Sequence, residues 1–448
     1  MKIPFNQNLI CLANLLTVPL YAVGGYVRNY LIDQTISSDI DLCSSVDSKC
    51  LYHALDKTAF KIIAEYPRTR TILFTDGNQK YEFTAMRIDG YTGGAHKPTV
   101  TEYTSDINQD AIRRDFKCNA VYYDIKNQQI VDPLNGVEDI KNKILDTVKE
   151  PTQVFMNDGL RLMRLARFCG ELGFSPTKNV LKSAKKYADN ILEIAPERIL
   201  EELKRILISD KKYSFSDPKG HYLGLKVLDE TRVLDRILPE LTLGRGMEQR
   251  KDYHRYDVLE HTLKTVEYAH HSVRIPALFH DIGKPYLYNL NGKFHGHDKT
   301  GAEIARKVLN RLKFDNQTTS ETVFLTKYHM LDMDLKMRAT KVRKFIVENY
   351  LLLDKLLKLK QADYSASKDD LKVCPTITKW KQELAKMKAE GVPFSLKDLK
   401  ITANQLMEMG IRGNQLGETL KTLFYKVIEN PKLNTQAKLL EMASKLAQ

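Results

Sequence analysis

Two aspartates near the start of the chain, Asp39 and Asp41, have the spacing needed to hold a divalent metal ion. They lie in the segment SDIDL, whose alternation of polar and apolar residues is typical of a strand with one buried face. Because side chains repeat every two residues along a strand, both carboxylates would lie on one face. Carboxylate oxygens there suit a divalent cation, although a solvated sheet edge is the simpler alternative for this pair taken alone.

A glycine pair stands shortly before the aspartates. Gly24 and Gly25 follow an apolar run at residues 20–23 and precede a segment, 26–32, with the pattern of a helix. Glycine amides at a helix N-terminus suit a phosphate group, whereas two adjacent glycines alone are more often a simple turn. The close spacing of this turn and the paired carboxylates predicts a site for a metal-bound nucleoside triphosphate.

Further polar groups could serve the same site. Glu82 lies in a β-rich run and is either a third metal-binding carboxylate or an ordinary strand residue. Arg113 and Arg114 stand side by side before Asp115 and Asn119 in RRDFKCNA. Two adjacent guanidinium groups suit a triphosphate because each can pair with phosphate oxygens. A charged start to a strand is the alternative.

Residues 151–174, PTQVFMNDGLRLMRLARFCGELGF, predict one strongly amphipathic helix. Asp158 and Arg161 are three residues apart, so they would share a face of that helix. Cytosine and adenine each offer an exocyclic amine beside a ring-nitrogen acceptor, so a carboxylate and a guanidinium could bind them and refuse uracil and guanine. A helical ion pair is the alternative. Arg164 and Arg167 extend a basic stripe toward either phosphate or solvent.

A second set of metal-binding residue types lies in the C-terminal half. His280 and Asp281 are adjacent at the end of an apolar helix in ALFHDIGKP, and His254 and His261 are predicted to lie on a helix before them. Histidine and aspartate together form divalent-metal sites, and a metal there could activate water to attack a phosphoester. Three residues farther along complete the set: His297, His329 and Asp363.

The elements that would carry these residues form an α/β beginning and a helical remainder. Residues 177–245 and 371–448 are helical by periodicity, and residues 90–104 are Gly/Thr-rich and aperiodic, which predicts a loop. Strand-like runs mixed with few helices indicate a small α/β domain near the start. These predicted strands lie at 60–64, 71–75 and 80–87.

The composition is that of a globular protein with a polyanionic partner. The 448 residues are 43% hydrophobic and 28% charged, with a formal charge of +13 and a pI of about 9.1. Excess lysine and arginine indicates a polyanionic partner, with a lysine-rich coding bias as the alternative. Six scattered cysteines without a CxxC pair favour a reduced, cytoplasmic location. The sequence shows no transmembrane-length apolar run and no signal peptide, so we expect no membrane partner.

The motifs resemble those of the class II nucleotidyltransferase superfamily, which contains the CCA-adding enzymes and the bacterial poly(A) polymerases. GGYVRN followed by SDIDL is similar to the signature GGxVRD…DxD, with Asn29 in place of the usual Asp after Arg28. RRDFKCNA is similar to RRDFTxNA, NDGLR at 157–161 to EDxxR, and PERILEEL at 196–203 to PERIxxEL. The later residues resemble the H…HD…D pattern of HD phosphohydrolase domains, which some CCA-adding enzymes carry behind the polymerase head.

The resemblance implies a mainly helical chain in four parts. An α/β nucleotidyltransferase head related to polymerase β would occupy 1–145, and a helical neck that binds nucleobase and RNA would occupy 146–245. An HD domain would follow at 246–370 and a helical tRNA-binding tail at 371–448. The resemblance also implies that the loop at 90–104 takes part in the switch from adding C to adding A.

The implied reaction is template-independent addition of CCA to the 3′ end of tRNA from CTP and ATP, by two-metal nucleotidyl transfer with Mg²⁺. By resemblance, the catalytic carboxylates are Asp39, Asp41 and Glu82, the first two holding Mg²⁺. The nucleotide-binding residues are Gly24, Gly25, Arg28, Arg113, Arg114, Asp115, Asn119, Asp158, Arg161, Arg164 and Arg167. The HD part would hold a divalent transition metal through His261, His280, Asp281 and Asp363, with His297 and His329 serving a second metal or a phosphate.

Rival functions stay open on the sequence. A poly(A) polymerase would share the head motifs and add long A tails, and a split-specificity enzyme would add only CC or only A. An HD phosphohydrolase with a vestigial head and a non-catalytic RNA-binding module belong to other classes. Against both stand the intact aspartates, arginine pair and base-reading pair of the head. The sequence indicates no oligomeric state.

Overall fold

The computed structural model describes residues 2–36, 39–46, 48–90 and 100–447. Contacts divide the chain into two compact units, Met1–Thr242 with Arg311–Lys313, and Leu243–Asn310 with Phe314–Gln448. The division after Thr242 falls close to the expected boundary between neck and HD domain, and the finer division into four parts stays a prediction. No helix in the described ranges is long and apolar enough to cross a membrane.

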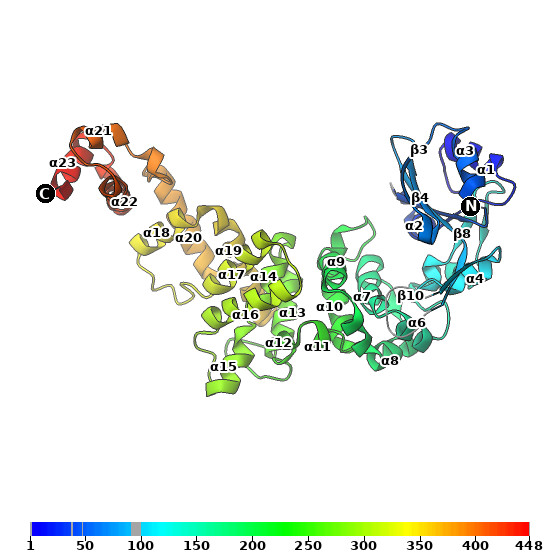
Figure 1. The fold of residues 1–448 in the computed structure, drawn as a ribbon. Helices are drawn as coiled ribbons and strands as arrows, with labels where there is room; N and C mark the ends of the chain where they lie inside the picture. Colours follow the sequence, from blue (N-terminus) through cyan, green and yellow to red (C-terminus); the bar gives the residue numbers. More distant parts are fainter. Residues whose placement is uncertain (1, 37–38, 47, 91–99, 448) are drawn as a thin grey trace. The chain divides into compact units, whose positions relative to one another are not determined.

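The first unit is built on a seven-stranded mixed sheet with the strand order β3-β4-β5-β2-β1-β8-β9 (Figure 1). β2 and β5 are parallel, and the other neighbours are antiparallel. A short antiparallel ladder joins β6 to β7, and a parallel one joins β10 to β11. The strands are β1 (Tyr21–Val23), β2 (Asp39–Ser44), β3 (Lys61–Tyr66), β4 (Thr71–Thr75), β5 (Lys80–Ala85), β6 (Arg87–Gly90), β7 (Val100–Tyr103), β8 (Tyr122–Asp124), β9 (Gln129–Val131), β10 (Ile144–Leu145) and β11 (Ser175–Pro176).

Helices flank this sheet, and the later part of the chain is mainly helical. Up to the division between the units they are α1 (Gln7–Leu15), α2 (Gly25–Asp33), α3 (Ser48–Leu55), α4 (Ile107–Ile112), α5 (Gly136–Asn142), α6 (Pro151–Asn157), α7 (Leu160–Leu172), α8 (Lys178–Lys186), α9 (Pro196–Leu207), α10 (Gly220–Glu230), α11 (Leu234–Ile237) and α12 (Pro239–Thr242). α7 packs against α9 and α10 (Figure 1), and its apolar side chains form the core of this helical part.

The remainder of the described chain contains helices and no strand. They are α13 (Val258–Tyr268), α14 (Arg274–Phe279), α15 (Gly283–Asn291), α16 (His297–Arg311), α17 (Asn316–Tyr328), α18 (Ala339–Glu348), α19 (Tyr350–Lys368), α20 (Pro375–Ala389), α21 (Ala403–Glu408), α22 (Asn414–Glu429) and α23 (Gln436–Ala447). The predicted fold class, an α/β head followed by all-α parts, is therefore confirmed.

The prediction of one helix over 151–174 is wrong. The helix breaks between α6 and α7, where Asp158 has an extended backbone and its carboxylate accepts a hydrogen bond from Leu160 N at 2.9 Å. Gly159 lies so close to Asn190 that a Cβ on it would stand 2.2 Å from the Asn190 carbonyl oxygen. A tertiary contact therefore interrupts the helix that the periodicity favours.

Two smaller predictions are wrong at the residues that the structure describes. Gly90 ends β6, and residues 100–103 form β7, so both ends of the predicted loop at 90–104 belong to a hairpin. Residues 91–99, and with them most of the segment expected to switch C to A addition, lie outside the described residues. His254 precedes α13 rather than lying on it, because Asp257 caps that helix by accepting from Glu260 N at 2.7 Å.

Candidate nucleotide site and metal centre

A cavity of about 510 Å³ lies in the first unit, between the sheet and the helices that follow it. Its lining contains eight arginines and four aspartates, a composition that suits a polyanion with an associated metal. All of the predicted nucleotide-binding residues meet there: Gly24, Gly25, Arg28, Arg113, Arg114, Asp115, Asn119, Asp158, Arg161, Arg164 and Arg167. The structure therefore brings together residues more than a hundred positions apart in the sequence.

The turn between β1 and α2 places the N-terminus of α2 beside a carboxylate. Gly24 has φ +76° and ψ −136°, a conformation that a residue with a side chain rarely adopts. A Cβ on Gly24 would lie 3.1 Å from Asp41 Oδ2. Glycine is therefore needed both for the turn and for the close approach of Asp41 to the N-terminus of α2.

Asp41 has two carboxylate neighbours. Asp39 lies two residues earlier on the same face of β2, and Glu82 on β5 is the register partner of Asp41. Burial raises the pKa of Asp41; Arg114 opposes the rise and Asp39 adds to it. Burial also raises the pKa of Glu82, and Asp41 and Asp39 raise it further. A divalent cation among the three groups would relieve this repulsion, so the donor set fits such an ion.

One buried carboxylate that the sequence did not reveal holds the predicted arginine pair. Asp110 Oδ1 lies 2.7 Å from Arg113 Nε, and Asp110 Oδ2 lies 3.0 Å from Arg114 Nη2. The hydroxyl of Tyr122 donates to the same carboxylate at 2.8 Å. Burial alone would raise the pKa of Asp110, but Arg114 and Arg113 hold that pKa well below its usual range. Asp110 therefore stays ionised and fixes both guanidinium groups.

Asp158 and Arg161 lie together at the start of α7, although not on one helix face as predicted. Both side chains are buried, and Asp158 Oδ2 lies 3.8 Å from Arg161 Nε. Arg161 Nη2 donates to the backbone carbonyl of Arg113 at 2.7 Å. The pair is thus fixed relative to the arginines that Asp110 holds.

The two later arginines of α7 do not form a solvated stripe, because Arg167 is buried and Arg164 is only partly exposed. Arg164 Nη2 lies 2.5 Å from Asp115, which also accepts from Asn119 Nδ2 at 3.0 Å. Arg167 lies 2.6 Å from Glu202 and 2.8 Å from Glu171. Carboxylates already neutralise both guanidinium groups.

Arg28 on α2 is buried and held by three neighbours. Asn29 Oδ1 accepts from Nε at 3.0 Å and from Nη2 at 2.8 Å, and Asn119 Oδ1 accepts from Nη1. Tyr213, on the segment between α9 and α10, accepts from Nη2 at 3.4 Å. Asn29 stands where the resembling motif usually has Asp, and it still anchors Arg28.

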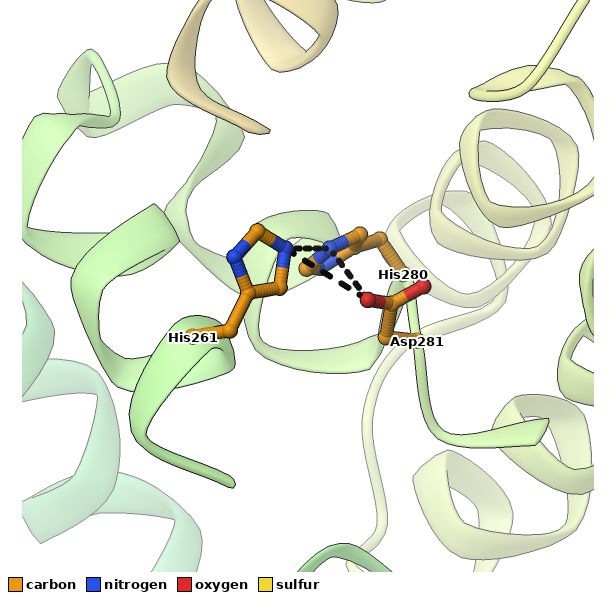
Figure 2. A group of neighbouring side chains, drawn as sticks. All are labelled: His261, His280 and Asp281. Atoms are coloured by element: carbon orange, nitrogen blue, oxygen red, sulfur yellow. Dashed lines mark hydrogen bonds and ion pairs between the residues drawn. The ribbon is translucent and has the colours of Figure 1, made fainter. Parts of the chain in front are cut away.

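The second unit brings all six predicted HD residues together (Figure 2 shows three of them). Asp281 lies between two histidine pairs. Its Oδ2 lies 3.5 Å from His261 Nε2 and 3.2 Å from His280 Nε2. Its Oδ1 lies 3.2 Å from His297 Nε2 and 3.5 Å from His329 Nε2. Asp363 Oδ1 lies 3.0 Å from His261 Nε2 and completes the set.

Backbone carbonyls orient these rings. The Nδ1 atoms of His280, His297 and His329 lie 2.8, 2.8 and 2.7 Å from the carbonyls of Ala277, Phe294 and Thr326. A carbonyl can only accept, so each Nδ1 carries a proton, and in the neutral ring each Nε2 presents a lone pair. The Nε2 atoms of His297 and His329 face each other at 3.3 Å. Two lone pairs so close repel unless a cation lies between them, so the donor set fits a metal centre.

Several residues of the two sites could not be found in the sequence. Arg87, Asp89, Arg198 and Tyr213 line the cavity, and Asp110 organises two of its arginines. Arg198 lies in the PERILEEL motif, whose resemblance to the family motif does not by itself assign a role to this arginine. The others carry no local pattern that distinguishes them from ordinary polar residues.

Comparison with known proteins assigns the class. Residues 20–146 match the family model of the poly A polymerase head domain, and residues 173–243 match that of a probable RNA and SrmB-binding site of polymerase A. Residues 254–364 match the HD domain. The fold and the cavity thus define a nucleotidyltransferase with an appended HD domain, and both kinds of domain use divalent metals.

Relatives extend this assignment along the chain. The chain is 32% identical to a CCA-adding enzyme of Anoxybacillus flavithermus over 195 residues, 42% of this chain and 46% of that protein, so the match spans less than half of that relative. It is 31% identical to a multifunctional CCA protein of Teredinibacter turnerae over 69% of this chain and 74% of that protein. The chain therefore belongs to the tRNA nucleotidyltransferase family of CCA-adding enzymes.

Two further observations bear on the fold and on the range of family members. The crystal structure of the Bacillus stearothermophilus CCA-adding enzyme in complex with CTP has the same fold, with a TM-score of 0.69 at 22% identity over 99% of this chain and 98% of that one. Other relatives are an A-adding tRNA nucleotidyltransferase of Deinococcus radiodurans, 30% identical over 62% of this chain and 64% of that protein, and a CC-adding one of Thermus thermophilus, 28% identical over 78% and 76%.

Proposed function

We propose that this protein adds C, C and A to the 3′ end of tRNA from CTP and ATP without a nucleic-acid template. The observation that carries the proposal is one cavity in which the strand carboxylate Asp41, the arginine pair held by Asp110 and the buried pair Asp158–Arg161 meet. These groups suit, in turn, a metal, a triphosphate and a nucleobase. The family relatives named for CCA addition support the same reaction.

In the proposed reaction the terminal ribose hydroxyl of the RNA attacks the α-phosphate in line, and pyrophosphate leaves. Asp39, Asp41 and Glu82 would hold Mg²⁺, which when bound lowers the pKa of the hydroxyl and neutralises the leaving group. Arg28, with the amides at Gly24 and Gly25 and the pair Arg113–Arg114, would bind the phosphates. The buried site would exclude water from the base.

Asp158 and Arg161 would select the base. A carboxylate accepts from the exocyclic amine of cytosine or adenine, and a guanidinium donates to the neighbouring ring nitrogen. Uracil and guanine would leave buried groups unpaired, at a cost of about 1–3 kcal/mol for each group. The same pair thus admits both nucleotides that the reaction needs.

A tRNA transcript lacking its last three nucleotides tests the proposal. The full chain is incubated with Mg²⁺ and with CTP and ATP, separately and together, and the products are sized on a sequencing gel. Three added residues with CTP required first support CCA addition. Two residues only, or one only on a CC-ended tRNA, mean split specificity, and a long ladder with ATP alone means a poly(A) polymerase. Asp39→Ala should abolish extension and keep tRNA binding; normal transfer by this variant overturns the metal assignment.

A second function is favoured by the geometry of the HD residues. We propose that the His–Asp cluster binds a divalent transition metal such as Ni²⁺ or Mn²⁺ and hydrolyses phosphomonoesters or cyclic phosphates. The observation is the position of Asp281 between two histidine pairs whose lone pairs converge. Hydrolysis that requires such a metal and is lost in His280→Ala supports this function, and hydrolysis unchanged in that variant refutes it.

A further inference from the structure

Arg28 differs from every other arginine of the cavity in its partners. Eight arginines line the cavity. Arg28 forms no ion pair within the part of the chain that the structure describes. The other seven each lie within 3.8 Å of a carboxylate oxygen: Arg87, Arg113, Arg114, Arg161, Arg164, Arg167 and Arg198.

The acceptors around Arg28 are all neutral. The amide oxygen of Asn29 takes two of its hydrogen bonds, the amide oxygen of Asn119 takes another, and the hydroxyl of Tyr213 takes the last. The ring of Phe168 lies 5.1 Å from the guanidinium carbon. Arg28 is only 2% exposed and Asn29 only 1%. The Arg28 guanidinium group therefore has hydrogen-bond acceptors, but none of those acceptors is negatively charged.

A buried cation without a counter-ion is unfavourable, because water solvates it poorly and no anion compensates. Among the carboxylates that line the cavity, Asp41 feels the charge of Arg28 without forming an ion pair with it. Asp41 would be committed to the metal ion. The remaining source of negative charge for Arg28 is a ligand in the cavity.

We propose that Asn29 is a positioning residue that keeps Arg28 electrostatically unpaired, so that its full charge is available to the triphosphate of the incoming nucleotide. This inference rests on the proposed nucleotidyl transfer. A carboxylate at position 29, the residue usual in the resembling motif, would occupy the same place and pair with Arg28. The neutral amide fixes the guanidinium equally well and does not compete with phosphate.

Two variants separate charge from position. Asn29→Asp keeps an acceptor for Arg28 and adds a negative charge. Asn29→Ala removes the acceptor and leaves the charge of Arg28 unpaired. Asn179→Asp is the matched control, because it adds the same charge at an exposed position of α8 away from the cavity. Arg28→Ala identifies the part of any binding signal that depends on this guanidinium.

The measurement is equilibrium binding by titration calorimetry of the full chain, without RNA. The probes are inorganic tripolyphosphate, which has no base, and CTP with Mg²⁺. We expect Asn29→Asp to weaken the Arg28-dependent binding of both probes about tenfold, which corresponds to about 1.4 kcal/mol. Asn29→Ala should bind tripolyphosphate more tightly than Asn29→Asp, and Asn179→Asp should bind it like the unmodified protein.

The melting temperature of the unliganded protein is an independent measurement. If Asn29→Asp merely damaged the structure, its melting temperature would fall. Pairing the buried cation should raise the melting temperature of Asn29→Asp by about 2–4 °C, while its affinity for the probes falls. Unchanged probe affinity in Asn29→Asp, or weakening in Asn29→Ala alone, overturns the inference, as does a lower melting temperature. Failed tRNA extension with these binding differences intact would refute the proposed reaction and leave the inference standing.

Discussion

Replacing Asp110 by asparagine should destabilise the first unit strongly. Asp110 is fully buried and pairs with Arg113 at 2.7 Å and Arg114 at 3.0 Å. Asn has the same shape, but its amide carries no charge and its NH₂ group would face a guanidinium donor. Removing one partner of a buried ion pair costs roughly 3–5 kcal/mol. The arginine side chains are 14% and 16% exposed, so water recovers part of this, and we expect about 3 kcal/mol.

The assay is urea unfolding at pH 7, followed by fluorescence and circular dichroism, with thermal melting alongside. A loss of about 3 kcal/mol corresponds to a fall of roughly 6–12 °C for a unit of this size. The matched control is Asp146→Asn, which breaks a pair with Lys117 at 2.6 Å whose side chains are 26% and 28% exposed. That pair is about a quarter exposed, so we expect at most about 1 kcal/mol.

The pH dependence follows from the sign of the shift. The folded pKa of Asp110 lies below its unfolded value of about 3.9. The stabilisation is therefore fully present above about pH 4 and is lost as the pH falls through the folded pKa. The unfolding free energies of the native protein and of Asp110→Asn should converge below about pH 4. A difference at pH 7 no larger than that of Asp146→Asn would refute the buried-charge reasoning.

Three further changes test other parts of the structure. Asp158→Ala should relax discrimination against UTP and GTP by about tenfold or more in single-turnover extension assays, since the lost acceptor is buried; unchanged selectivity would contradict base reading. Gly159→Ala should lower the unfolding free energy by about 1–3 kcal/mol in urea titrations, because its Cβ would meet a carbonyl oxygen at 2.2 Å, and a neutral effect would show that the α6–α7 break adapts freely. Lys360→Met removes hydrogen bonds to the carbonyls of His329 and Leu331, both 2.6 Å long; elemental analysis should find less bound metal per chain, and full occupancy would show that the lysine does not position His329.

Local sequence patterns predicted those features of the sites that residues close together in the sequence determine. A two-residue period gave the shared face of Asp39 and Asp41, and a glycine pair after an apolar run gave the turn into α2. The HD residues were predicted as a set because their types and order along the chain are distinctive. In each case the information lies within a few residues of the chain or in a motif.

The features that the sequence could not predict depend on contacts between residues far apart in the chain. The periodicity of 151–174 favours one helix, but the approach of Gly159 to Asn190, 31 positions away, breaks it. Asp110 precedes the arginine pair by three residues and has the pattern of a surface helix, yet it is buried beneath β8 residue Tyr122. Tyr213 reaches Arg28 from 185 positions away. Burial and partner choice at such distances depend on the packed fold.

The two metal-binding groups differ in a way that follows from their surroundings. Asp39 and Asp41 lie on β2, the middle strand of the sheet, beside Glu82 of β5, so a cation there would have few protein ligands and would keep much of its water. Mg²⁺ tolerates this, and it is usually bound through one or two carboxylates together with substrate phosphates. The HD ligands are buried, their rings are fixed by backbone carbonyls, and imidazole nitrogen dominates the set. Such a site would bind a transition metal without substrate. We therefore expect the head to need its triphosphate to complete the metal site, whereas the HD cluster would be complete within the protein.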